Sequence, residues 1–223
     1  MKYSKRLRYI LFIVLALVPV FYSLIVWKQL PQNVPTHFDL NGQANGYTDK
    51  HWLWILSIIN IAAYLITQNV GRIDPKRINR PNSSISRLGE VVSLFITGIN
   101  VLIVYAAIHP EKNVMSYTNP LIGILFIILG NYMYNLKPNY FAGIKVPWTL
   151  ASDYNWKKTH QLGGRLWFIG GIILVVAGLF FPKNIESYAF SITIAILIIV
   201  PIAYSFMLFK KESKTPGYFD KQN

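Results

Sequence analysis

The sequence predicts an all-α integral membrane protein with six transmembrane helices and both termini in the cytoplasm. The chain has 223 residues, of which 53% are hydrophobic and only 14% are charged, against about 25% charged residues in soluble domains. Its mean hydropathy is +0.35, and its apolar residues form long blocks. A soluble globular fold needs more polar surface than this chain carries. The absence of cysteine excludes disulfide frameworks, thiolate zinc sites and cysteine nucleophiles.

Six apolar blocks approach the length of about 20 residues that a helix needs to cross a bilayer. These blocks are Tyr9–Trp27, Trp52–Thr67, Leu88–Ile108, Leu121–Tyr134, Arg165–Phe181 and Tyr188–Phe209. The fourth block is the shortest. We accordingly divide the chain into 1–67, the first two helices with the loop between them, and 68–134, the third and fourth helices. The remainder is 135–209, a polar segment with the last two helices, and 210–223, a basic tail.

The basic residues indicate the orientation of the chain. Of the 22 Lys and Arg residues, all but four flank the spans on one side. The exceptions are Lys28, Lys50, Lys112 and Lys183. The positive-inside rule therefore places both termini in the cytoplasm. Topology and anionic head groups account for the net charge of +13, so we expect no direct nucleic-acid partner. The basic start and long first apolar run favour a retained anchor over a cleaved signal peptide.

The segment between the first two spans is predicted to be a turn-rich extracellular loop. Its two Asn-Gly pairs, Asn41-Gly42 and Asn45-Gly46, favour tight turns, and a short hairpin is one form that the loop could take. Trp27, Trp52 and Trp54 bracket the loop and fit an interfacial aromatic belt.

No metal or cofactor is expected in this loop. His37, Asp39 and His51 offer no further ligand nearby that would complete a zinc site. The pattern that begins at Asp39 has Lys50 where a calcium loop needs a bidentate glutamate, which excludes an EF-hand.

A second polar segment, Asn135–Gly164, is predicted to form a cytoplasmic lid between the fourth and fifth helices. Ser152 fits a helix N-cap, and Asp153 is favourably placed in the first turn. Trp156 and His160 follow on one face, so we expect this helix to continue into the fifth span. Tryptophans in a basic segment favour a lid that lies against the membrane surface.

Small residues recur with a seven-residue spacing in the fourth and fifth spans. They are Gly123 and Gly130 in the fourth, and Gly164, Gly171 and Gly178 in the fifth. A seven-residue step returns to nearly the same helix face, and small residues let helices approach closely within lipid. We favour internal packing of these two spans. The alternative is a groove that accepts another helix, either from a second copy or from a peptide.

Ionisable and polar residues are few inside the spans. Glu90 is expected to pair with Arg87 three residues earlier. Asn60, Asn100 and Asn131 are expected to form hydrogen bonds between helices. The sequence contains no His-Glu-x-x-His and no Gly-x-Ser-x-Gly motif, so we expect no enzyme activity.

The lid segment carries a motif that resembles the signature of the SdpI-like immunity proteins. The motif comprises Asn139, Gly143, Ile144, Lys145, Val146, Pro147, Trp148, Thr149, Leu150, Ser152, Asp153, Trp156, Thr159, His160 and Gly163. The family pattern has arginine and threonine where this chain has Lys145 and Val146, and lysine keeps the charge but lacks the planar fork of arginine. The outer stretch from Leu30 to Gly42 is similar to the small N-terminal domain of unknown function that accompanies this signature.

The resemblance implies a plasma-membrane immunity or resistance protein that protects its bacterial cell from a secreted, membrane-active peptide toxin. In the best-known relative of this family the protein also signals, by holding a cytoplasmic transcriptional repressor at the membrane. For this chain the candidate toxin-binding residues are His37, Asp39, Asn41, Gly42 and Tyr47. The alternative is a small transporter or exporter of the toxic compound, although an ion-coupled carrier should show a midplane acid or a pair of broken helices.

Overall fold

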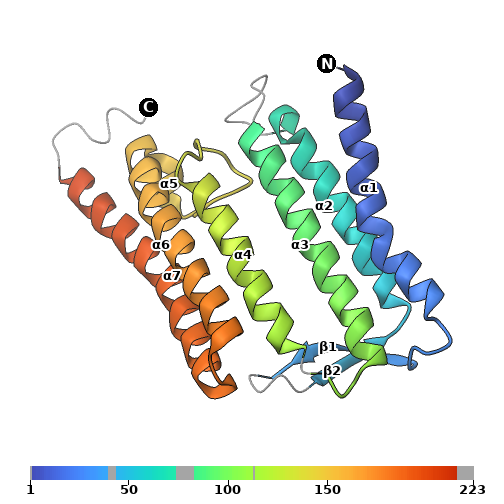
Figure 1. The fold of residues 1–223 in the computed structure, drawn as a ribbon. Coiled ribbons are helices and arrows are strands. Elements are labelled where there is room, and N and C mark those ends of the chain that lie inside the picture. The colour runs from blue at the N-terminus through green and yellow to red at the C-terminus, as the bar shows by residue number, and fades with distance from the viewer. Residues whose placement is uncertain (1, 40–43, 74–82, 113, 215–223) are drawn as a thin grey trace.

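The computed structural model describes residues 2–39, 44–73, 83–112 and 114–214 (Figure 1). Its long helices are α1 (Lys2–Ile25), α2 (Trp52–Ile73), α3 (Ser83–Ile108), α4 (Met115–Met133), α6 (Asp153–Phe180) and α7 (Lys183–Ser213). A short helix, α5 (Pro147–Ala151), precedes α6, and two strands, β1 (Asn33–Phe38) and β2 (Ala44–Asp49), lie between α1 and α2. The described chain is therefore mostly helical.

Five of these helices, α1, α2, α3, α6 and α7, are long and apolar enough to cross a membrane, and α4 contributes a shorter apolar stretch, Thr118–Met133. This composition agrees with an all-α, multi-pass membrane protein. Five full-length spans are found in the described part of the chain where six were predicted, because the apolar part of α4 is shorter than a full crossing needs.

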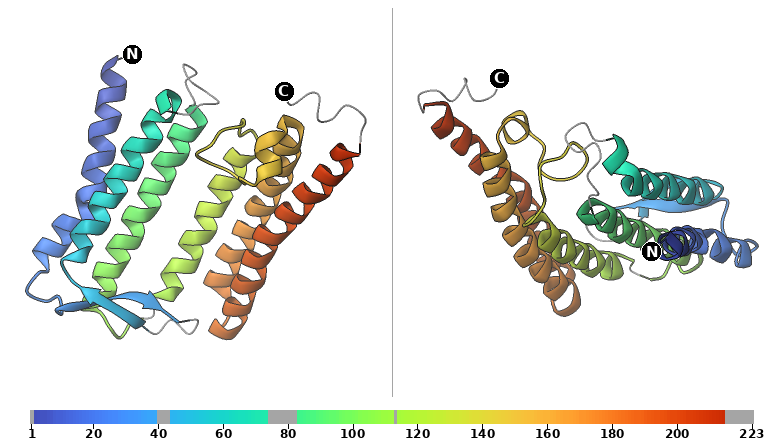
Figure 2. Two further views of the ribbon diagram at one scale, coloured as in Figure 1. Left: turned by 180° about the vertical axis from the view of Figure 1, so that it is seen from behind. Right: turned by 90° about the horizontal axis from the view of Figure 1, so that it is seen from above.

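The long helices form two groups (Figure 2). In the first group α1, α2 and α3 pack against one another, and in the second group α6 packs between α4 and α7. The contact between α4 and α6 is the most extensive in the molecule, and α3 meets α4 where the groups adjoin. Each group therefore has its own packing interface.

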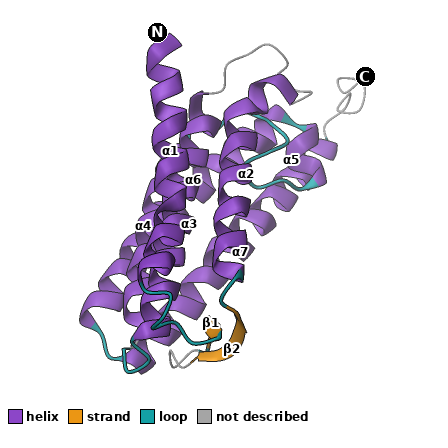
Figure 3. Ribbon diagram, turned by 90° about the vertical axis from the view of Figure 1, so that its right-hand side faces the viewer, coloured by secondary structure: helices purple, strands orange, loops and turns teal. Residues whose placement is uncertain are grey.

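The two polar segments lie at opposite ends of the helices (Figures 1 and 3). The strands lie at one end, here called the hairpin end. Helix α1 begins at the other end, the lid end, where α7 terminates and where α4 is connected to α5. The described chain therefore begins and ends at the same end of the helices. Which end faces the cytoplasm is still a prediction from the distribution of charge.

Helix α6 starts in the lid and continues without interruption through its apolar part. The Ser152 side chain accepts a hydrogen bond from the Asn155 N–H at 3.1 Å, which satisfies one of the free donors at a helix start. Asp153 lies in the first turn, where a negative charge is favoured. The polar first turns of α6 and its apolar span are thus one continuous helix.

The glycines of α4 and α6 face one another. A Cβ atom placed on Gly171 would lie 2.5 Å from the carbonyl oxygen of Gly123, and one placed on Gly130 would lie 2.7 Å from that of Gly164. Gly178 meets the first part of α4 in the same way. The stripe on each helix is therefore filled by the other helix, and the open groove considered as an alternative is not formed on this face.

Two of the expected polar contacts inside the first group differ from the prediction. Glu90 pairs with Arg8 of α1, whose Nη2 lies 2.6 Å from both carboxylate oxygens. Its partner is thus on another helix, instead of Arg87 one turn away on the same helix. This ion pair ties α1 to α3 near the lid end.

The three asparagines also behave differently from one another. Asn60 Nδ2 donates to the Ser93 carbonyl at 3.2 Å and to Thr97 Oγ1 at 3.0 Å, as expected for a bond between helices. Asn131 is exposed on α4. Asn100 is buried, but its Nδ2 has no hydrogen-bond partner among the described residues.

Candidate functional site

The segment between α1 and α2 forms an antiparallel β-hairpin. Its register pairs Asn33 with Asp49 and Phe38 with Ala44, with an irregularity after Pro35. Val34 is fully buried in a cluster with Leu30 and Leu53 and with residues of α3. Burial of this strand residue anchors the hairpin on the ends of α2 and α3, since apolar contact is the main source of stability for so small a sheet.

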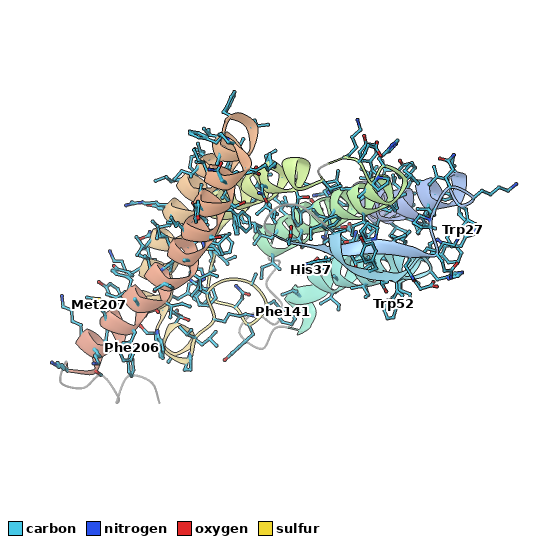
Figure 4. All side chains as sticks on the ribbon, turned by 90° about the horizontal axis from the view of Figure 1, so that it is seen from below. Trp27, His37, Trp52, Phe141, Phe206 and Met207 are labelled. Atoms are coloured by element: carbon cyan, nitrogen blue, oxygen red, sulfur yellow. The ribbon has the colours of Figure 1, made fainter. Side chains whose placement is uncertain are left out.

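An aromatic cluster holds the hairpin to the start of α2. The rings of Trp27 and Trp54 stack with centroids 5.1 Å apart, and Lys50 Nζ lies 4.3 Å from the Trp27 ring centroid. Hydrogen bonds from the backbone and the side chain of His51 hold the pKa of Asp49 below its ordinary value. Asp49 therefore stays ionised at the junction between β2 and α2. Figure 4, seen from the hairpin end, shows Trp27 and Trp52 at the edge of the first helix group.

A cleft of about 910 Å³ opens beside the hairpin. One wall comes from the strands and the other from the end of α3 and the connection to α4. Lining residues include Asn33, Pro35 and Tyr47 on the first wall, and Pro110, Glu111 and Lys112 on the second. We call this space the hairpin cleft. Its second wall was missed by sequence reasoning, because that wall is distant from the hairpin along the chain.

The predicted binding positions fall in different places. Tyr47 is 61% exposed and lines the hairpin cleft, where its hydroxyl donates to the Ala44 carbonyl at 3.3 Å. His37 is exposed and pairs through Nδ1 with the Asn45 side chain. Asp39 is half-buried just after β1. Asn41 and Gly42 lie outside the described residues. Among the described members of this set, Tyr47 is the one that lines the cleft.

The lid, residues 135–152, is organised around a buried tryptophan and histidine at the start of α6. Trp156 and His160 are both fully buried, and their rings stack with centroids 4.0 Å apart. Trp156 Nε1 donates to the Leu136 carbonyl at 2.7 Å. The Ile144 N–H donates to His160 Nε2 at 2.9 Å, and His160 Nδ1 lies 2.7 Å from the Trp156 carbonyl, to which it donates. With one nitrogen accepting and the other donating, the imidazole is neutral, and it fixes the lid to α6.

Gly143 and Asn139 shape the loop above this pair. Gly143 has φ +115°, a conformation that favours glycine, and a Cβ atom there would collide with His160 Nε2. The buried Asn139 side chain donates to the Lys137 and Ala142 carbonyls at 2.9 and 3.1 Å. Its Oδ1 also accepts two backbone N–H groups, so that one side chain closes the loop on itself.

Further hydrogen bonds fasten the lid to α7. Trp148 Nε1 donates to Ser205 Oγ at 2.7 Å, and Asn155 Nδ2 donates to the Ser205 carbonyl at 2.9 Å. Ser152 Oγ donates to Glu212 Oε1 at 2.9 Å. Asn155, Ser205 and Glu212 were missed by sequence reasoning. Ser205 gave the one usable signal, as a polar residue within an apolar span.

The motif residues thus divide into two sets. Asn139, Thr149, Trp156 and His160 are fully buried, and Thr149 Oγ1 accepts the Val146 N–H at 3.1 Å inside the loop. The exposed set is Gly143, Lys145, Pro147 and Asp153, while Trp148 is half-buried against α7. Lys145 Nζ lies 3.2 and 3.3 Å from the Tyr140 and Phe141 carbonyls. The buried set builds the lid, and the exposed set gives it a charged surface.

Residues 135–205 contain the lid, α5, α6 and most of α7, and therefore nearly all of these contacts. This segment matches the SdpI/YfhL protein family. A second segment, residues 14–61, matches a domain of unknown function, DUF1648, and it contains the later part of α1, the hairpin and the start of α2. The two matches therefore contain most of the two candidate sites, the SdpI segment at the lid end and DUF1648 at the hairpin end.

The chain is also similar to a characterised protein over most of its length. It is 23% identical over 189 residues to Immunity protein SdpI of Bacillus subtilis (strain 168), covering 85% of this chain and 89% of that protein. No solved structure matches the chain. The resemblance expected from the two motifs is confirmed, with the SdpI and DUF1648 segments in the predicted order.

Proposed function

We propose that the chain is a plasma-membrane immunity protein that protects a bacterial cell by binding a secreted, membrane-active peptide toxin. The observation that carries this proposal is the similarity to Immunity protein SdpI along 85% of the chain, together with the SdpI match over the lid and the span that follows it. The long apolar helices support a location in the membrane, where a membrane-active peptide would act. A peptide of this kind harms a cell by inserting apolar surface into lipid, so capture at the membrane prevents damage without any covalent chemistry.

The hairpin cleft is the proposed first contact with the peptide. Its volume of about 910 Å³ is at the upper end of the range for ligand sites. Tyr47 offers a large apolar ring with a polar tip, which suits a surface that is half in water and half in lipid. Glu111 and Lys112 supply both signs of charge on the facing wall. His37, Asp39, Asn41 and Gly42, the other positions predicted from the sequence, are proposed as further contacts with the peptide.

The lid surface is the proposed contact for a cytoplasmic transcriptional repressor. Lys145 and Asp153 are exposed there, and Tyr154 is 54% exposed beside them. Because Trp148 and Ser152 are bonded to α7, a shift of α7 would move this surface. A signalling role therefore needs no further domain.

A protection assay tests the immunity function. A sensitive bacterium that produces the chain is exposed to conditioned medium from the source bacterium, and survival is counted. We expect the wild type to protect, and Tyr47→Ala to lower protection about tenfold, because losing a central aromatic contact costs about 1–2 kcal/mol of binding. Tyr188→Ala is the matched control, since Tyr188 is 70% exposed on α7.

No protection by a wild-type chain that is present in the membrane would contradict the proposal. Energy-dependent movement of the peptide across the membrane of vesicles that contain the chain would instead support the alternative function, export of the toxic compound.

A further inference from the structure

A second cavity, of about 410 Å³, lies between α2 and α3 under the hairpin. It is lined by Thr36 and Thr48 of the strands, Trp52 and Leu56 of α2, and apolar residues of α3 around Asn100. We call it the lateral cavity. No ionisable side chain is among its lining residues in the described chain, so it suits an uncharged, apolar occupant.

The hairpin separates the two cavities. Pro35 and Tyr47 line the hairpin cleft, whereas their neighbours Thr36 and Thr48 line the lateral cavity. Successive residues of a strand point to opposite faces, so each cavity uses one face of the same small sheet. A ligand long enough to leave one cavity would reach the other by passing the edge of the hairpin.

Asn100 is the polar residue that α3 contributes to the lateral cavity. It is 3% exposed, and its Nδ2 has no partner among the described residues. The donor of Asn60, on α2, is paired, because its Nδ2 donates to both Ser93 and Thr97, although its Oδ1 has no partner among the described residues. A buried donor without a partner is unfavourable, so a ligand that supplies the missing hydrogen bond is favoured at Asn100.

The depth of Asn100 distinguishes a peptide from a lipid. Asn100 lies eight residues before the end of α3 at Ile108, which is about 12 Å along the helix axis at 1.5 Å per residue. One leaflet of hydrocarbon is about 15 Å thick, so Asn100 is well below the lipid esters and head groups. An acyl chain offers no hydrogen-bonding group at that depth, whereas an inserted peptide carries side-chain and backbone groups along its whole length.

We propose that the lateral cavity binds an apolar, membrane-inserted peptide segment that presents one uncharged polar group, such as a carboxamide or a hydroxyl, to the side chain of Asn100. This inference rests on the proposed function and names its membrane-embedded subsite. The polar part of the peptide occupies the hairpin cleft, and the apolar part passes the hairpin into the lateral cavity. Burial of the peptide against Trp52, Leu56 and α3 keeps it from inserting freely in the bilayer.

Two synthetic probe peptides test this site directly. Both are polyleucine helices of about 20 residues with lysine ends, and one carries a single asparagine about 12 Å from its outer end, matching the depth of Asn100. The full chain, labelled through Lys28→Cys, is reconstituted with each dye-labelled peptide in vesicles of phosphatidylcholine and phosphatidylglycerol. Energy transfer between the two dyes measures association. The label is unique because the chain has no other cysteine.

We expect the asparagine peptide to bind the wild type about threefold to thirtyfold more tightly than the all-leucine peptide, as for hydrogen bonds between helices in lipid. Asn100→Leu should abolish this preference. Asn131→Leu, the same change at an exposed position on α4, should retain it. Equal binding of both peptides by the wild type, or an unchanged preference in Asn100→Leu, would overturn the proposal.

A stability measurement separates this role from internal packing. Asn60→Leu removes two hydrogen bonds and should lower the melting temperature, whereas Asn100→Leu should leave it unchanged. If Asn100→Leu lowered the melting temperature as much as Asn60→Leu does, Asn100 would be shown to pair within the helix bundle. That result would reject the site. Protection of cells without selective peptide binding would keep the immunity function and reject the lateral cavity. Selective peptide binding without protection of cells would support the lateral cavity and reject the immunity function.

Discussion

At the scale of single residues, the lid depends on a few side chains that have more than one partner. His160 accepts from the Ile144 N–H and donates to the Trp156 carbonyl, while Gly143 leaves room for its ring. Each of these contacts links the loop to α6. The exposed surface of the lid is therefore held in place largely by side chains buried beneath it.

Gly143→Ala should destabilise the folded chain by about 2–4 kcal/mol, because it combines an unfavourable positive φ with loss of the hydrogen bond to His160. Gly98→Ala is the matched control, since a Cβ there meets only Leu121 at 3.4 Å and alanine favours a helix. Thermal unfolding in detergent, followed by circular dichroism, measures both. Equal melting temperatures for the two variants would show that the lid is not clamped at Gly143.

Sequence reasoning identified the lid motif but could not assign its roles. Trp156 and His160 fall on one face by spacing alone, and the structure buries both. Their partners Leu136 and Ile144 act through backbone atoms, which leave no pattern in the sequence. For the same reason the unpaired Nδ2 of Asn100 could not be told from the paired Nδ2 of Asn60. In the sequence, each of these two asparagines is a single polar residue within an apolar helix.

At the scale of helices, the interface between α4 and α6 is set by backbone contact. Gly123 and Gly171 each lie where a Cβ atom on one would come within 2.7 Å of the carbonyl oxygen of the other. Within lipid such close approach replaces the hydrophobic drive that joins helices in water. The lid is carried on this pair of helices, so its position depends on the interface.

Gly171→Leu should separate α4 from α6 and lower the amount of folded protein, with a loss of about 1–3 kcal/mol from overpacking. Ile172→Leu is the control, because Ile172 is 42% exposed next to it and the change conserves volume. Yield of monodisperse protein and melting temperature measure the effect. A Gly171→Leu chain as stable as the control would contradict the close interface.

Apolar blocks predicted where helices cross the membrane better than where they begin and end. The start of α2 at Trp52 and the end of α3 at Ile108 are as predicted. Helix α6 begins at Asp153, twelve residues before the predicted apolar block, because the polar turns at its start are helical without being apolar. The Ser152 N-cap predicted this start correctly where hydropathy did not. Hydropathy indicates which residues contact lipid. It therefore does not predict the part of a helix that extends beyond the lipid.

At the scale of the whole molecule, two helix groups carry two sites at opposite ends. The hairpin end bears the cleft and the lateral cavity, and the lid end bears the charged loop (Figures 1 and 3). The distribution of lysine and arginine predicts that the lid end is cytoplasmic. Capture outside the cell and signalling inside it both require this orientation.

Single-cysteine labelling in intact cells tests this central claim most directly. Lys28→Cys reports on the hairpin end and Lys157→Cys on the lid end, and both positions are exposed in a chain without cysteine. A maleimide that cannot cross membranes should label Lys28→Cys in intact cells and Lys157→Cys only after the cells are made permeable. Labelling of Lys157→Cys in intact cells, with Lys28→Cys protected, would show the opposite orientation in the membrane. It would contradict capture at the hairpin end and signalling at the lid end.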